Sequence, residues 1–187
     1  MTKKNLYLLT IITFLLLIFL YSNFHKKSSS KINYDYSIKT EEGKPITVAR
    51  VIDGDTIELI NEERLRYIGI DTPEEVNPRK PVQCYAKEAA TKNQQLVEGK
   101  KIIFYKDISV RDKYGRWLGF VYLEDGTFVN LELTKQGFAF AYPYVPDTSK
   151  KREFKEAEKQ AAEKNLGLWS HCQVHKTSYG RKQTNTI

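Results

Sequence analysis

Residues 46–75 read ITVARVIDGDTIELINEERLRYIGIDTPEE, a run of short apolar segments separated by polar and acidic turns. Asp53-Gly54 and Asn61-Glu62 are typical of tight connections between strands. Because strands joined by such turns run antiparallel, this stretch predicts the first part of a small β-structure. The strands that its apolar and β-branched residues predict are Ile46–Ile52, Thr56–Ile60 and Arg64–Ile70.

The rest of the chain adds helices and keeps the strands short. Apolar residues spaced at three and four predict helices over Tyr85–Val97, Val129–Gln136 and Ser149–Asn165. Further strands are expected at Lys101–Tyr105 and Trp117–Leu123. Strands and helices do not alternate regularly, which disfavours a parallel sheet. We therefore predict an α+β fold, mainly β, built around a small antiparallel barrel.

Composition limits the classes of protein to consider. Hydrophobic residues make up 41% and charged residues 28% of the 187, so neither a fully disordered nor a fully membrane-embedded chain fits. Two cysteines exclude a four-cysteine zinc site. The net charge of +7 comes from the chain ends, because residues 32–172 hold 22 Lys and Arg against 23 Asp and Glu. Nucleic-acid binding must therefore rest on where individual basic residues lie.

The two ends of the chain are predicted to lie outside the folded domain. Residues 1–24 carry an apolar run whose length lies between that of a signal peptide and that of a spanning helix. No small-x-small cleavage site follows it, which favours an uncleaved anchor, with residues 5–24 in the membrane, over a cleaved signal peptide. We expect an exported protein, either anchored and facing outside the cell or secreted. Residues 25–43 are expected to be a polar tether, 44–172 the domain, and 173–187 a flexible basic tail.

Two acidic clusters lie at strand ends that a hairpin brings together. Asp53-Gly54-Asp55 precedes the second strand, and Asp71-Thr72-Pro73-Glu74 follows the third. Antiparallel pairing of these strands places Asp55 close to Asp71. Two carboxylates meeting there repel each other unless a cation lies between them, and hard oxygen donors suit Ca²⁺ or Mg²⁺ better than zinc. The alternative is that Asp-Gly-Asp only forms a turn.

Basic and aromatic residues near these clusters suggest a phosphate-containing substrate. Strand alternation puts Arg64, Arg66 and Ile68 on one face of the strand that leads to Asp71, with Leu65, Tyr67 and Gly69 on the other. The stretch Arg111–Arg116 offers guanidinium, ammonium and phenol groups for phosphate contacts and base stacking. Tyr142 and Tyr144 add two aromatic rings in a later loop. The alternatives are a solvated strand arginine and tyrosines that merely cover the core.

Four motifs in this order and spacing resemble the staphylococcal nuclease (thermonuclease) family. They are Ile52–Thr56, Arg66 with Asp71-Thr72-Pro73-Glu74, Asp112–Arg116, and Leu168-Trp169-Ser170. The resemblance covers about residues 44–172. It implies a five-stranded OB-type barrel with three helices. It also implies Ca²⁺-dependent hydrolysis of DNA and RNA that leaves 3′-phosphate ends.

The same resemblance assigns roles to individual residues. Asp55, Asp71 and the Thr72 carbonyl would bind calcium, and Asp53 would lie near the metal. Glu74 would position the attacking water, and Arg66 and Arg116 would stabilise the transition state. The positions that match nucleotide-contacting residues are Lys113, Tyr114, Tyr142 and Tyr144. Arg79 and Lys80 are further candidates for phosphate contacts. Stacking on tyrosines predicts a preference for single-stranded DNA and RNA, and we expect a monomer.

Cys84 and Cys172 are a departure from the best-known member of that family, which has no cysteine. In an exported chain the two residues are expected to form one disulfide, the alternative being two unpaired thiols. Two rival functions also remain open at this point. One is a catalytically inactive nucleic-acid-binding module of the same fold, and the other is a membrane-tethered calcium-binding module. Neither rival explains why the carboxylates and both arginines are present together.

Overall fold

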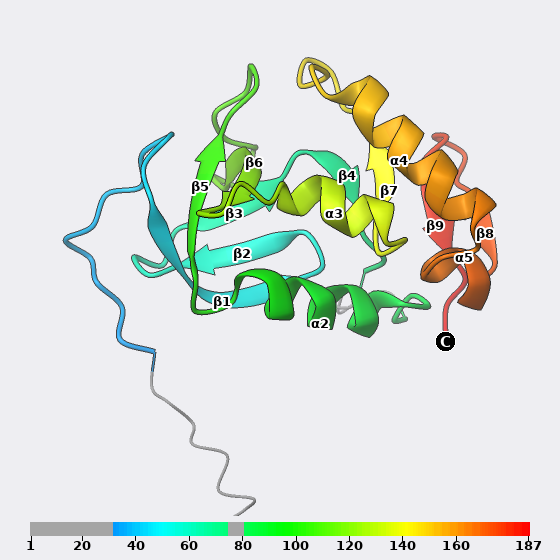
Figure 1. The fold of residues 1–187 in the computed structure, drawn as a ribbon, viewed down its shortest axis with the longest axis horizontal. Helices are drawn as coiled ribbons and strands as arrows, with labels where there is room; N and C mark the ends of the chain where they lie inside the picture. Colours follow the sequence, from blue (N-terminus) through cyan, green and yellow to red (C-terminus); the bar gives the residue numbers. More distant parts are fainter. Residues whose placement is uncertain (1–31, 75–80) are drawn as a thin grey trace, which may run out of the picture. The chain divides into compact units, whose positions relative to one another are not determined.

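The computed structural model describes residues 32–74 and 81–187, and Figure 1 shows its fold. The strands in these residues are β1 (Ile46–Asp53), β2 (Thr56–Leu59), β3 (Arg64–Tyr67), β4 (Gly69–Asp71), β5 (Lys101–Tyr105), β6 (Trp117–Leu123), β7 (Phe140–Tyr142), β8 (Val174–Lys176) and β9 (Lys182–Thr184). The helices are α2 (Ala86–Val97), α3 (Val129–Lys135), α4 (Lys151–Glu163) and α5 (Leu168–His171). The three predicted helices are confirmed, and α5 is a short fourth one that was not predicted.

Five strands close into a barrel in the order β1-β2-β3-β6-β5, which confirms the mainly β fold. The expectation of a wholly antiparallel barrel is wrong, because β3 and β6 pair in parallel. The reason is a matter of parity. Neighbours in an antiparallel sheet alternate in direction, so a closed ring with an odd number of strands must contain at least one parallel pair. Leu65 of β3 lies opposite Trp117 of β6 at this closure.

The predicted strand Arg64–Ile70 is divided into two at Ile68. β3 belongs to the barrel, whereas β4 leaves it and pairs with β7. Gly69 stands at the break with a φ of +80°, and a Cβ at this position would lie 2.3 Å from the Phe154 ring. Only glycine combines this backbone conformation with so close an approach to a buried ring. The break directs Asp71 toward the segment that contains β7.

The core fills the barrel and the space beneath the helices. Its largest fully buried side chains include Tyr67, Phe104 and Phe154. On β3, Leu65 and Tyr67 face this core while the two arginines of the strand face outward, as the strand alternation predicts. α2 lies along the outside of β1, and α3 packs against α4 (Figure 1). The barrel thus fixes the outward-facing residues of β3 on a rigid support.

Both ends of the described chain are more ordered than predicted. Within the segment expected to be a tether, the Asp35 amide donates to the Ile60 carbonyl at 2.7 Å and the Tyr34 hydroxyl to Glu58 at 2.6 Å. The expectation of a flexible tail is also wrong, since β8 and β9 form an antiparallel hairpin. The apolar run within residues 1–24 lies outside the described residues. In the part of the chain that the structure describes, no helix is both long and apolar enough to cross a membrane.

Candidate active site

The two acidic clusters meet at one end of the barrel, as the hairpin predicts. Asp55 and Asp71 are both almost fully buried. The Thr72 amide donates to Asp55 Oδ2 at 3.0 Å, which joins the two turns directly. A Cβ on Gly54 would lie 2.6 Å from the Thr72 hydroxyl oxygen. A glycine between the two aspartates of the first turn is therefore what lets the second turn come so close.

Arg66 bridges the two buried carboxylates. Its Nη1 lies 2.5 Å from Asp55 Oδ1, and its Nη2 lies 2.9 Å from Asp71 Oδ1. Burial disfavours the charged guanidinium, but Asp55 and Asp71 outweigh that effect and raise the pKa of Arg66. The arginine therefore stays cationic in a site that strongly attracts positive charge.

The carboxylates of this site are crowded and desolvated. Burial, and after it the negative charge of Asp55, raises the pKa of Asp53 to about 7. The same two causes raise the pKa of Asp71. Asp53 also accepts a hydrogen bond at 3.0 Å from the Asp55 amide, which fixes the turn between them. Burial and mutual repulsion thus favour either protonation of these carboxylates or cations beside them, and Arg66 is one such cation.

Glu74 follows the second acidic turn and is held by its backbone. Its amide donates to Gln83 Oε1 at 2.9 Å, and its carbonyl accepts from the Gln83 amide at 3.0 Å. Gln83 is buried, so this pair of bonds anchors the chain on both sides of residues 75–80, which lie outside the described residues. The predicted phosphate contacts Arg79 and Lys80 fall in that range. The side chain of Glu74 remains about one-third exposed and lines the adjoining cleft.

Arg116 approaches the same cleft from the connection between β5 and β6. Its Nε donates to Asp112 Oδ2 at 2.7 Å, and Asp112 Oδ1 accepts from the Arg116 and Tyr114 amides. This arrangement closes a tight turn that presents Lys113 and Tyr114 outward. The Lys113 ammonium and the Arg116 guanidinium lie 5.0 and 5.6 Å from the Tyr114 ring centroid.

The end of β7 and the loop after it place two further tyrosines, so Tyr142 lies on a strand rather than in the predicted loop. The rings of Tyr142 and Tyr144 lie with centroids 6.3 Å apart and planes 20° apart, an offset stack. Asp147 connects this loop to the loop that precedes Arg116, because its Oδ1 accepts from the Ile108 and Ser109 amides at 2.9 and 2.8 Å. The two aromatic loops are thus fixed to each other.

One cleft of about 760 Å³ collects these groups. The predicted site residues that line it are Asp53, Arg66, Asp71, Glu74, Lys113, Tyr114, Arg116, Tyr142 and Tyr144. Asp55 and Thr72 do not line it and lie behind it, buried. The sequence-predicted site is therefore assembled in one place, with carboxylates at its base and basic and aromatic groups around it.

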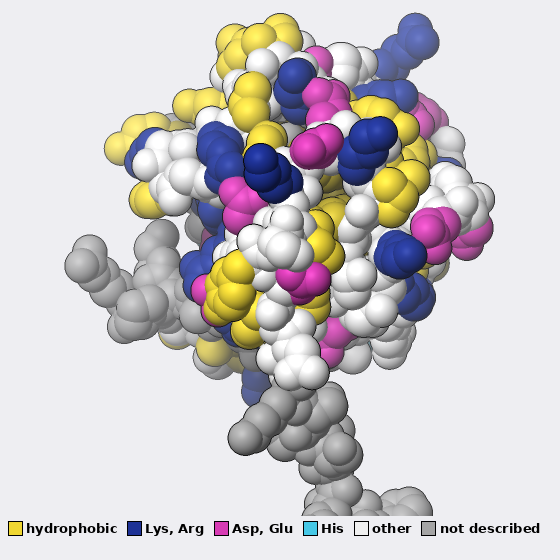
Figure 2. All heavy atoms as spheres, turned by 90° about the vertical axis from the view of Figure 1, so that its left-hand side faces the viewer, with side chains coloured by type: hydrophobic (Ala, Val, Ile, Leu, Met, Phe, Trp, Pro, Cys, Tyr) yellow, Lys and Arg dark blue, Asp and Glu magenta, His cyan; other side chains and the backbone are white. Residues whose placement is uncertain are grey.

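The charge on the neighbouring face of the domain is mixed. Figure 2 shows the side of the molecule that lies at the left of Figure 1, where Lys and Arg side chains alternate with Asp and Glu. No single basic patch dominates that view. That face therefore offers no continuous basic surface for a polyanion, whereas the cleft contains Arg66, Lys113 and Arg116.

The comparisons with known proteins all point to one protein family. A family model described as "Staphylococcal nuclease homologue" matches residues 64–171. The chain belongs to the staphylococcal nuclease family. This membership confirms the predicted enzyme class, a nuclease that hydrolyses phosphodiester bonds.

Three relatives show how far the similarity extends within the staphylococcal nuclease family. The Thermonuclease of Staphylococcus intermedius is 38% identical over 168 residues, 87% of this chain and 94% of that protein. Endonuclease YncB of Bacillus subtilis is 36% identical over 155 residues, 80% of this chain and 73% of its own. The SPbeta prophage-derived endonuclease YokF of B. subtilis is 41% identical over 130 residues, 67% of this chain and 44% of its own.

One arginine of this staphylococcal nuclease site, Arg181, is not among the residues predicted from the sequence. Arg181 donates from Nε to Asp71 Oδ2 at 2.6 Å and from Nη2 to Asp71 Oδ1 at 2.8 Å. Its Nη2 also lies 3.4 Å from Glu74 Oε1. The sequence did contain a signal, because Tyr179-Gly180 marks a turn and Gly180 adopts a φ of +77°. Residues 173–187 have no apolar alternation, however, and nothing local indicates where the hairpin packs.

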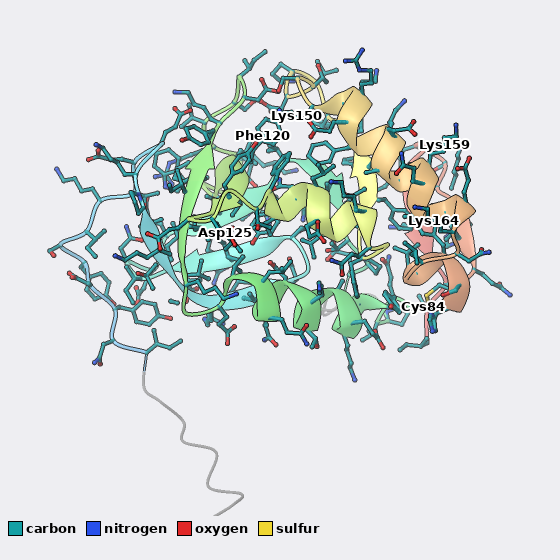
Figure 3. The ribbon with its side chains drawn as sticks, in the orientation of Figure 1. Cys84, Phe120, Asp125, Lys150, Lys159 and Lys164 are labelled. Carbon is teal, nitrogen blue, oxygen red and sulfur yellow. A yellow bond between two sulfur atoms is a disulfide. The ribbon has the colours of Figure 1, made fainter. Side chains whose placement is uncertain are left out.

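The structure contains the disulfide between Cys84 and Cys172. Figure 3 labels Cys84, whose bond to Cys172 ties the start of α2 to the end of α5. The Cys84 backbone also bonds to the last strand, since its carbonyl accepts from the Thr184 hydroxyl at 2.9 Å and its amide donates to the Asn185 carbonyl at 2.7 Å. The bridge therefore fixes the hairpin of β8 and β9 to the nuclease domain.

Proposed function

We propose that this protein is a calcium-dependent nuclease that hydrolyses DNA and RNA with little sequence specificity and leaves 3′-phosphate ends. One observation carries the proposal more than any other. Asp55 and Asp71 are buried side by side with the Arg66 guanidinium across them, at the base of a cleft that Glu74 also lines. A carboxylate pair, an arginine and a glutamate at one cleft are the groups that metal-assisted phosphodiester hydrolysis needs.

The donors at the base of the cleft fit calcium. Asp55 and Asp71 supply carboxylate oxygens, and the carbonyl of Thr72 adds a neutral oxygen, which together form a hard donor set. Among the described residues no group of three His, Cys, Asp or Glu is arranged for a metal ion. The third ligand in this proposal is the Thr72 carbonyl, at the position that the family resemblance assigns to it. When bound, calcium would offset the negative charge that otherwise keeps a nucleophile away from the phosphodiester.

The side chains of the chain itself would carry out the remaining steps. Glu74, held in place through Gln83, would orient a water molecule in line with the departing 5′-oxygen and accept its proton. Arg66 and Arg116 would donate to the phosphate oxygens, on which charge increases in the transition state. Displacement of the 5′-oxygen leaves the phosphate on the 3′ side.

The exposed tyrosines favour unpaired strands as substrate. Tyr114 and Tyr144 are 72% and 68% exposed, which leaves their ring faces available to bases. Stacking on an aromatic ring tolerates any base but requires that the base be free of its partner strand. Single-stranded DNA and RNA should therefore be cleaved faster than a stable duplex.

We further propose that the enzyme acts outside the cell, anchored through residues 5–24 or secreted, and as a monomer. The disulfide between Cys84 and Cys172 supports export, because disulfides form and persist in oxidising compartments. Residues 32–187 hold 25 Lys and Arg against 23 Asp and Glu, which is close to neutral, so substrate affinity without metal should be modest.

The experiment that tests the proposal measures acid-soluble nucleotide release from single-stranded DNA by the full chain, with Ca²⁺, with Mg²⁺ and with chelator. The variant Glu74→Gln is compared with Glu41→Gln, an exposed glutamate that precedes β1. We expect calcium-dependent release that is lost with Glu74→Gln and kept with Glu41→Gln. If the wild-type protein binds calcium and DNA but releases nothing, the protein is instead a nucleic-acid-binding module of the same fold.

A further inference from the structure

The β8–β9 hairpin brings a third arginine into the cleft. Arg181 donates two parallel hydrogen bonds to the Asp71 carboxylate, a bidentate geometry that the planar guanidinium of arginine allows and the ammonium of lysine does not. Its guanidinium carbon lies 5.8 Å from the centroid of the Tyr142 ring. It therefore occupies the space between the calcium-binding carboxylates and one of the stacking tyrosines, and it is about one-third exposed there.

The hairpin that carries Arg181 is held in place at several points. Cys172, which directly precedes it, is bonded to Cys84. Lys182, the neighbour of Arg181, forms an ion pair with Glu158 of α4. At the end of the chain the Ile187 amide donates to the Val82 carbonyl at 3.0 Å. Figure 1 shows β8 and β9 beside α4 and α5 as part of the folded domain. Arg181 is thus built into the site rather than carried on a free end.

Arg66 and Arg181 have similar surroundings, so the proposed role of Arg66 indicates what Arg181 can bind. Both guanidinium groups bond to the same Asp71 carboxylate, and both line the same cleft. Arg66 is the one that the proposed mechanism already uses for the substrate phosphate. A calcium ion bound by Asp71 would take over the oxygens that Arg181 holds. The freed guanidinium would then need another anionic partner, and a phosphodiester offers the same bidentate geometry as a carboxylate.

We propose that Arg181 is a third phosphate-binding arginine of this nuclease, which exchanges Asp71 for a phosphate of the bound strand once calcium occupies the acidic turns. The inference rests on the proposed function, because it requires a nucleic-acid substrate and a metal at Asp71. It assigns the C-terminal hairpin to the substrate-binding surface.

The test measures binding of a short single-stranded oligonucleotide to the full chain, with its disulfide intact and calcium saturating. All proteins carry Glu74→Gln so that the oligonucleotide is not cleaved. Arg181→Gln is compared with Lys176→Gln, which removes one positive charge from an exposed position on the same hairpin. Arg181→Lys retains the positive charge but cannot form the two parallel hydrogen bonds of a guanidinium. Affinity is recorded over a range of salt concentrations, and calcium affinity is measured separately by calorimetry without DNA.

We expect Arg181→Gln to weaken oligonucleotide binding by about 10-fold to 100-fold, as for a hydrogen bond to a charged group. The slope of log affinity against log salt should become shallower by about 0.7, the value for one phosphate contact on a single strand. Arg181→Lys should restore the salt slope but only part of the affinity. Lys176→Gln should change both much less than Arg181→Gln.

An Arg181→Gln protein with unchanged DNA affinity and unchanged salt slope would overturn the inference. If that protein also bound calcium more tightly, Arg181 would be only an internal competitor for the metal. Nucleotide release by the protein with Glu74 intact is measured in parallel. If the wild-type protein releases nucleotides but Arg181→Gln does not change oligonucleotide binding, this inference alone is refuted. If the wild-type protein releases no nucleotides, the proposed function is refuted.

Discussion

The two sides of the cleft differ in how far apart their residues lie in the sequence. On the barrel side, Asp55 directly precedes β2, Arg66 lies on β3, which pairs with β2 as a hairpin, and Asp71 ends the short strand β4 that follows. On the other side, Arg181 reaches Asp71 across 110 residues and depends on the β8–β9 hairpin for its position. The first side is determined by strand pairing and short turns. The second depends on a disulfide and on hydrogen bonds between chain segments that are distant in sequence.

The largest expected effect is on stability, and it tests whether the disulfide holds the β8–β9 hairpin, which carries Arg181, in place. The double variant Cys84→Ser/Cys172→Ser loses a cross-link between residues 88 positions apart. The chain-entropy argument then predicts a loss of roughly 4 kcal/mol in the free energy of unfolding. Chemical denaturation of the oxidised wild-type protein and of the double variant measures this difference.

The reduced wild-type protein is the control for that variant, and its stability should match that of the double serine variant. Limited proteolysis locates the change, since cleavage should begin within residues 173–187 while the barrel stays intact. Equal unfolding midpoints for the oxidised protein and the double variant would show that the hydrogen bonds around Cys84 are sufficient to hold the hairpin.

The next effect belongs to the barrel side and to catalysis. Arg116→Gln should lower kcat by about 10²- to 10³-fold, as the loss of one transition-state donor does in other hydrolases. Stability should change little, because the partner of Arg116 is Asp112 on a surface turn rather than a buried carboxylate. Steady-state kinetics on single-stranded DNA measure the change.

Arg64→Gln is the matched control for that substitution. Arg64 also faces outward from the barrel, but it is about half exposed and its ion-pair partner is Glu58. It does not line the cleft. A rate for Arg64→Gln close to that of the wild-type protein, beside a large loss for Arg116→Gln, would localise the effect to the cleft. Equal losses would contradict the assigned role of Arg116.

The barrel side of the cleft is predictable from the sequence because its signals are local. Spacing within about 20 residues predicts the Asp-Gly-Asp turn, the shared strand face of Arg64 and Arg66, and the hairpin that joins both acidic clusters. The odd number of strands could also have predicted that a closed barrel contains a parallel pair, although not that the pair is β3 with β6. Arg181 could not be predicted, because its hairpin is polar and short, and its contacts are formed only by the folded domain.

A smaller effect tests the close approach of the two acidic turns. Gly54→Ala adds a Cβ 2.6 Å from the Thr72 hydroxyl oxygen and within 2.8 Å of two of its carbons. Overpacking of this kind typically costs about 1–3 kcal/mol. We therefore expect a less stable protein that binds calcium more weakly, as measured by thermal unfolding and calorimetry.

The double variant Gly54→Ala/Thr72→Gly separates steric crowding from other causes. It removes the three side-chain atoms that the new Cβ would meet and keeps the backbone carbonyl that is the proposed ligand. Calcium affinity should return at least in part. If calcium affinity is lost with Gly54→Ala and not regained in the double variant, a clash with the Thr72 side chain is not the reason that a glycine is needed at position 54.

An effect of similar size concerns the exposed tyrosines that line the cleft. Tyr114→Leu removes an exposed ring next to Lys113 and Arg116 and should weaken binding of single-stranded DNA by about 1–3 kcal/mol, the contribution of one stacked base. Binding of duplex DNA should change less, because paired bases cannot stack on the ring. Tyr105→Leu is the control, since Tyr105 is 47% exposed on β5 and its ring packs against Tyr122. Equal losses on single-stranded and duplex DNA would mean that Tyr114 contacts the phosphate backbone rather than a base, and the proposed strand preference would then have to come from elsewhere in the cleft.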